Sequence, residues 1–106
     1  MAWTYLLLAG LFEVIWAFAM KKSEGFTLIT PTIITIVMML VSFSLLSIAM
    51  KSLPLGTAYT VWTGIGAVGA FIFGVIFLSE ALTPTRIFAA ILIILGIILM
   101  KLASTD

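Results

Sequence analysis

The stretch LAGLFEVIWAFAM, Leu8 to Met20, is apolar at every position except Glu13. A run of this kind is typical of a membrane-spanning helix. Glu13 follows Trp3 by ten residues, which places it about 15 Å along a helix and near the bilayer midplane. Because a carboxylate at that depth costs roughly 2.5 kcal/mol or more, we expect it to face a cavity or a partner and not lipid.

The composition extends this interpretation to the whole chain. Of its 106 residues, 64% are hydrophobic and 8% are charged, against about 25% charged residues in soluble domains. The net charge of +1 provides no basic surface for nucleic acid. The chain has no cysteine and no histidine, which disfavours disulfides, zinc sites and hydrolytic triads. We therefore expect an all-α integral membrane protein without metal or cofactor.

Charged residues and prolines divide the chain into four apolar segments. The predicted spans are residues 3–20, 31–50, 56–79 and 84–102 of a single domain, 1–106, and each is close to the ~20 residues that cross a bilayer. Thr30 with Pro31, and Thr83 with Pro84, resemble an N-cap followed by proline at the first helical position. The connections are short, which predicts a bundle of four antiparallel transmembrane helices.

The positive charges give almost no orientation signal. Lys51 and Lys101 fall on the side of the N-terminus, and Lys21, Lys22 and Arg86 fall on the other. Because lysine and arginine normally set orientation, a nearly even split predicts insertion in both directions. Two oppositely inserted copies would then form an antiparallel, dual-topology homodimer, equivalent to the inverted repeat of many transporters.

Helical spacing suggests which residues surround Glu13. Gly10 and Trp16 share its helical face, and Tyr59 and Trp62 open the third span with Thr63 on the same face. The missing side chain of Gly10 either makes room for a ligand or allows close packing of helices. Trp16 lines the site or a helix interface. Tyr59 and Trp62 are also compatible with a belt of aromatic residues at the membrane–water interface. Periodicity does not choose between Ser42 and Ser44 in the second span.

Small residues in the last two spans predict movement and packing. Gly64 and Gly66 lie within three residues of each other and favour a helix kink. Ala89 and Gly96 are seven residues apart on one face of the fourth span, a spacing expected of a packing seam. We therefore assign that seam to dimerisation.

The motifs AGLFEVIWA around Glu13 and MKSLPLGTAYTVWTGIGAVGA, with the length of four spans, resemble the small multidrug resistance family over essentially the whole chain. They are most similar to its guanidinium exporter branch. The resemblance implies an antiparallel dimer in the inner (plasma) membrane, in which Glu13 binds either protons or a small cation. It also places Ser42, in preference to Ser44, with Tyr59 and Trp62 around the glutamates and Trp16 and Gly10 close by. The family often has glycine where this chain has Ala89.

The resemblance implies a proton-coupled antiporter of guanidinium and small substituted guanidinium ions. Guanidinium is planar and carries only donors, which suits a carboxylate. Trp62 offers only an N–H, so we expect it to donate to Glu13 or to stack on the ligand, while Ser42 and Tyr59 hold the carboxylate. The alternatives are an exporter of hydrophobic quaternary ammonium compounds and a non-transporting structural subunit. An enzyme is disfavoured because one deep acid offers no catalytic constellation.

Overall fold

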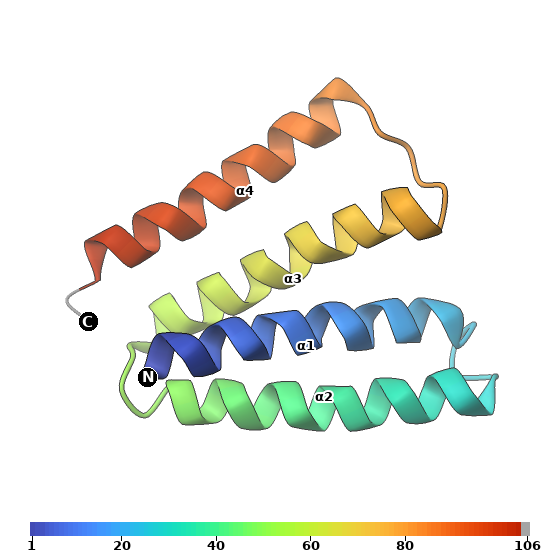
Figure 1. Cartoon of the computed structure of the whole chain (residues 1–106), viewed down its shortest axis with the longest axis horizontal. Helices are drawn as coiled ribbons and strands as arrows, with labels where there is room; N and C mark the ends of the chain where they lie inside the picture. The colour runs from blue at the N-terminus through green and yellow to red at the C-terminus, as the bar shows by residue number, and fades with distance from the viewer. Residues whose placement is uncertain (105–106) are drawn as a thin grey trace.

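Within residues 1–104, which the computed structural model describes, the chain forms four helices and no strand. They are α1 (Ala2–Lys22), α2 (Ile29–Ala49), α3 (Leu55–Phe77) and α4 (Pro84–Ala103). All four are long and apolar enough to cross a membrane. Successive helices run in opposite directions, so the start of α1 and the end of α4 lie at the same end of the bundle (Figure 1). The predicted fold class of four membrane-spanning helices is confirmed.

The helix bounds differ from the predicted spans by at most two residues at either end. The expected single domain of residues 1–106 remains a prediction, and residues 105–106 lie outside the described residues. The helix order places Lys51 and Lys101 at the end of the bundle that holds the N-terminus. Lys21, Lys22 and Arg86 lie at the opposite end, as predicted.

One of the two predicted threonine caps is correct. The side chain of Thr83 accepts a hydrogen bond from the backbone N–H of Arg86 at 3.2 Å, and Pro84 begins α4. This contact satisfies one of the N–H groups that a first helical turn leaves without a partner.

The predicted start of α2 is wrong. Its first helical residue is Ile29, Leu28 is the capping residue in extended backbone, and Thr30 lies inside the helix. Pro31 is consequently the third helical residue and not the first. The first-turn N–H groups have no acceptor within the helix, so a proline anywhere in that turn removes no hydrogen bond. Proline in the sequence therefore located the first turn but not its first residue.

The interior of the molecule is formed by three helices. Helix α1 lies between α2 and α3 and packs against both, whereas α4 packs along α3 (Figure 1). The buried cluster consists of residues from α1, α2, α3 and the α2–α3 connection: Leu6, Ala9, Leu46, Ala49, Leu53, Ala58, Val61 and Trp62. None of the described residues of α4 is buried. The end of α4 also contacts α1, because the Lys101 ammonium lies 4.8 Å from the centre of the Trp3 ring.

Candidate functional site

Glu13 lies in the middle of α1, on the side that faces α3. Its carboxylate occupies the space beside Gly66, where a Cβ atom on that glycine would overlap it. The Glu13 Oε1 atom is buried and has no hydrogen-bond partner among the described residues. Buried polar atoms are nearly always paired, and an acid within a membrane is expensive to keep unless it has a function. An unpaired carboxylate oxygen at this depth is therefore suited to binding a cation or a proton.

Ser42 connects the three inner helices through two hydrogen bonds. Its fully buried hydroxyl donates to the Ala9 carbonyl at 2.7 Å and accepts from the Trp62 indole N–H at 3.0 Å. Ala9 lies one helical turn before Glu13. The network therefore fixes the turn of α1 that carries the carboxylate to α2 and α3.

This network corrects one expectation about the site. Trp62 donates to Ser42 and not to Glu13, and the Ser42 hydroxyl donates to a backbone carbonyl and not to the carboxylate. A hydroxyl can donate and accept at once. The Ser42 hydroxyl therefore accepts from the buried indole N–H and donates its own proton to the Ala9 carbonyl. Both polar side chains thus act on Glu13 through the backbone of α1, and the carboxylate is left unpaired.

Four aromatic rings form a row beside this network. The ring centres of Trp16 and Phe43 are 6.2 Å apart, those of Phe43 and Trp62 are 5.7 Å apart, and those of Trp62 and Tyr59 are 5.6 Å apart. Tyr59 is 53% exposed and Phe43 is 44% exposed, so the row is partly open at its surface. Aromatic faces of this kind attract cations.

Phe43 is the member of the row that the sequence reasoning missed. It stands directly after Ser42 in an apolar helix, where its apolar side chain resembles those that face lipid. The one available signal was its position as an aromatic between Ser42 and Ser44 of α2. The structure brings it into contact with Trp16 and Trp62, which the sequence did place at the site.

Gly10 and Trp16 have packing roles in this structure. A Cβ atom on Gly10 would lie 2.6 Å from the Ile65 side chain, so the absence of a side chain permits α1 and α3 to approach closely. The Trp16 ring meets Phe43 edge to face, and its indole N–H is buried without a hydrogen-bond partner in the described chain. Trp16 therefore packs against α2 with an unused donor, and its role in binding remains a prediction.

The kink predicted at Gly64 and Gly66 remains a prediction, since α3 is one helix from Leu55 to Phe77. Each glycine instead accommodates a neighbour. A Cβ atom on Gly64 would lie 3.0 Å from the side chain of Ile97 on α4, and one on Gly66 would overlap Glu13. The two glycines thus face different helices.

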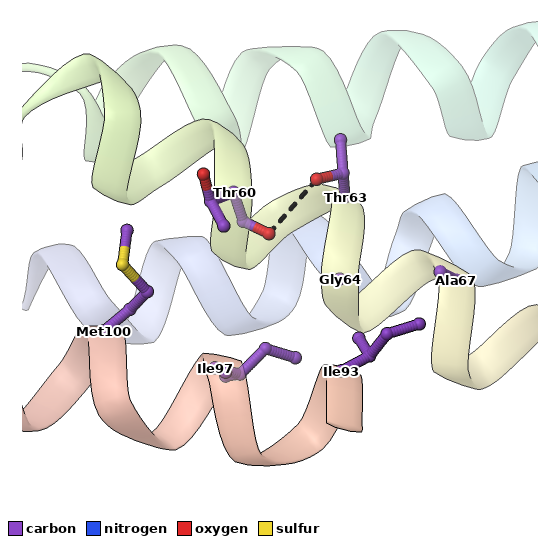
Figure 2. A pocket seen from close by; sticks show the side chains of 8 residues that line it. Thr60, Thr63, Gly64, Ala67, Ile93, Ile97 and Met100 are labelled. Carbon is purple, nitrogen blue, oxygen red and sulfur yellow. Dashed lines mark hydrogen bonds between the residues drawn. The ribbon is translucent and has the colours of Figure 1, made fainter. Parts of the chain in front are cut away.

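A groove of about 510 Å³ separates α3 from α4 (Figure 2). It is lined by Thr60, Thr63, Gly64, Ala67, Ile93, Gly96, Ile97 and Met100. Thr63, expected to face Glu13, lies here and donates to the carbonyls of Tyr59 and Thr60. Ala89 lines a neighbouring hollow of about 140 Å³ between the same two helices. Nothing lies within 4 Å of the point where a Gly96 Cβ would stand, and the dimer role of Ala89 and Gly96 remains a prediction.

Comparison with known proteins gives consistent matches over the chain. The family model described as "Small Multidrug Resistance protein" matches residues 1–94. A protein of Citrobacter freundii named "Guanidinium exporter" is 55% identical over 104 residues, which cover 98% of this chain and 99% of that protein. The proteins of the same name in Escherichia coli (strain K12) and Salmonella typhimurium are 54% and 55% identical over the same lengths.

Proposed function

The chain belongs to the small multidrug resistance family, and we propose that it is a proton-coupled antiporter that exports guanidinium and small substituted guanidinium ions. As a member of this family with four spanning helices, it is a multi-pass protein of the inner (plasma) membrane. The observation that carries the proposal is the buried, unpaired Glu13 oxygen on the helix that also contributes Trp16 to the row of aromatic rings. The name "Guanidinium exporter" of relatives at 54–55% identity supports this choice of substrate.

Transport rests on competition for Glu13. Guanidinium carries donors in a planar fork and no acceptor, so it pairs with an ionised carboxylate. A proton on the same carboxylate removes the charge that holds the cation. Either ligand therefore excludes the other, and an inward proton gradient drives the cation outward when the site faces each side of the membrane in turn.

The remaining site residues act on geometry and on the face of the cation. Ser42 and Trp62 fix the Glu13 turn of α1 through the Ala9 carbonyl, so the carboxylate is oriented before the ligand arrives. The exposed part of the aromatic row offers ring faces, onto which a planar cation stacks. Tyr59 stands at the open end of the row and is half-exposed, and in this proposal its hydroxyl bonds to the ligand or to the carboxylate. Together these contacts favour a flat, donor-rich ion.

The working unit in this proposal is an antiparallel homodimer. The nearly even distribution of lysine and arginine over the two ends favours insertion in both orientations, and the face of α4 that carries Ala89 and Gly96 supplies the seam. A tag on the C-terminus should be accessible from both sides of the membrane. Labelling from one side alone would contradict the homodimer, provided that the same cells contain no related chain with the opposite distribution of lysine and arginine.

The aromatic row also supports a second substrate class. Rings that are partly exposed hold bulky quaternary ammonium ions by apolar contact and charge, without any need for an oriented carboxylate. A non-transporting structural subunit is the alternative of another class, in which Glu13 would be a protonated packing residue. We propose no enzymatic activity, because the site offers one acid and no partner for catalysis.

The decisive experiment is transport in proteoliposomes under a pH gradient, with guanidinium and tetrapropylammonium, a bulky quaternary ammonium ion, as competing substrates. We expect guanidinium movement coupled to proton movement in the opposite direction, and weaker transport of the bulky cation. Proton release on addition of guanidinium to the detergent-solubilised protein serves as a second measurement. Preference for the bulky cation would favour the second substrate class, and the absence of transport and of proton release for both ions would favour the structural subunit.

A further inference from the structure

An apolar groove of about 370 Å³ runs along the outside of α1 and α2, away from Glu13. It is lined by Ile15, Phe18, Ala19 and Lys22 of α1 and by Pro31 and Ile34 of α2. The four α1 residues share one helical face at spacings of three and four. Lys22 is the last residue of α1, so the groove has a cation at its mouth and hydrocarbon side chains deeper in the membrane.

A second hollow of about 520 Å³ adjoins the first near the connection between α1 and α2. Lys21, Lys22, Glu24, Leu28 and Leu78 line it. Lys22 belongs to both hollows. The two spaces together therefore present an apolar channel, a cation at its mouth, and a charged basin at the membrane surface.

The lysines of this basin are available for an external anion. Neither Lys21 nor Lys22 forms an ion pair with a carboxylate of the described residues. The Lys22 ammonium lies 5.7 Å from the centre of the Phe18 ring, so its side chain is folded back toward the groove. At the same end of the molecule, Glu80 is already paired with Arg86 at 3.6 Å.

We propose that this composite groove binds an anionic phospholipid, with an acyl chain along Ile15 and Ile34 and the phosphate at Lys22. A phospholipid is the ligand whose apolar tail, charged phosphate and polar head follow one another in the same order as the three parts of the site. The net charge also selects the headgroup. The two lysines and Glu24 give the basin a net charge of +1, which the phosphate of an anionic lipid neutralises. A zwitterionic lipid adds an ammonium group as well as a phosphate, so the positive charge of the basin is left uncompensated.

Native mass spectrometry of the detergent-solubilised full-length protein tests the proposal, with dioleoylphosphatidylglycerol and dioleoylphosphatidylcholine as probes. We expect dioleoylphosphatidylglycerol to bind more tightly than dioleoylphosphatidylcholine. Lys22→Gln should weaken its binding about fivefold, since a basic residue near an anionic lipid contributes about that factor. Lys51→Gln, at the opposite end of the bundle, is the matched control and should leave this binding unchanged.

A second pair of variants tests the acyl part of the site without altering charge. Ile34→Trp should fill the groove and weaken lipid binding severalfold, whereas Ile36→Trp, on an exposed position of α2 outside the groove, should not. Equal affinity for the two lipids, or equal behaviour of Lys22→Gln and Lys51→Gln, would overturn the proposal. Displacement of the lipid by inorganic phosphate would overturn it as well, because the site would then recognise a free anion and not a lipid.

Discussion

Helices α1 to α3 and helix α4 make opposite use of similar sequences. The first three enclose the buried cluster and the Ser42–Trp62 network, whereas α4 has no buried residue among those described and leaves a groove along α3. Yet α2 and α4 are equally apolar. Apolar character in a membrane therefore identifies a span without telling which spans pack closely.

The difference follows from what drives helices together in lipid. Lipid tails are as apolar as leucine, so association depends on close packing and on hydrogen bonds between helices. Helix α1 has both, because Gly10 permits contact with α3 and the Ala9 carbonyl accepts the Ser42 proton. Helix α4 has no buried residue among those described. Its free face is therefore available to lipid or to a second copy.

The largest expected effect separates function from folding in the α1–α3 region. Glu13→Gln keeps the size of the side chain but cannot exchange a proton in the working range, so gradient-driven transport of guanidinium should be abolished. The purified variant should still elute as the wild-type assembly. Transport assays in proteoliposomes and size-exclusion chromatography provide the two measurements. Wild-type transport by this variant would refute the proposed mechanism.

The second effect compares packing in the two regions directly. Leu6 of α1 is fully buried, whereas Leu95 of α4 is 50% exposed. Leu6→Ala should lower the free energy of unfolding by about 2 kcal/mol or more, because it leaves a cavity among close-packed neighbours. Leu95→Ala should change it by less than about 0.5 kcal/mol. Steric-trap unfolding in detergent measures both, and equal losses would show that α4 is packed as tightly as α1.

The third effect tests the hydrogen-bond network that joins α1, α2 and α3 at Ser42. Ser42→Ala leaves the buried Trp62 N–H without its acceptor and frees the Glu13 turn, so guanidinium binding should weaken about tenfold. Binding of an apolar quaternary ammonium ion should fall less. Ser44→Ala is the matched control, since Ser44 is exposed and its hydroxyl bonds only to the Leu40 carbonyl of its own helix. Isothermal titration that showed equal losses for both ions would assign Ser42 a purely structural role.

The smallest effect concerns the groove between α3 and α4, which Gly96 lines. A leucine at position 96 meets nothing within 4 Å in the single chain but would obstruct a partner that packs into this groove. We expect Gly96→Leu to raise the dimer dissociation constant about fivefold, at the low end of overpacking penalties. Gly56→Leu, which also meets no atom within 4 Å, is the control. If the two variants dimerise equally well, the seam lies elsewhere.

The sequence was a good guide to the helices because length and hydropathy alone define a membrane span. It located the N-terminal cap at Thr83 but misplaced the start of α2, since proline is compatible with every position of a first turn. It was a weaker guide to the site. The hydrogen bonds that it suggested from Ser42 and Trp62 to Glu13 are replaced by bonds to Ala9 and Ser42, and Phe43 was not identified.

The sequence by itself determined that this is a four-span membrane protein with one deep carboxylate, because each of those properties is local and follows from consecutive residues. Only the tertiary structure decided that Ser42 takes the indole proton of Trp62 and donates to Ala9, that Gly66 faces Glu13 while Gly64 faces α4, and that α4 stays at the periphery. Those outcomes depend on the rotation and approach of helices that are distant in the chain. A helical period identifies which residues share a face, but contacts between helices determine what that face meets.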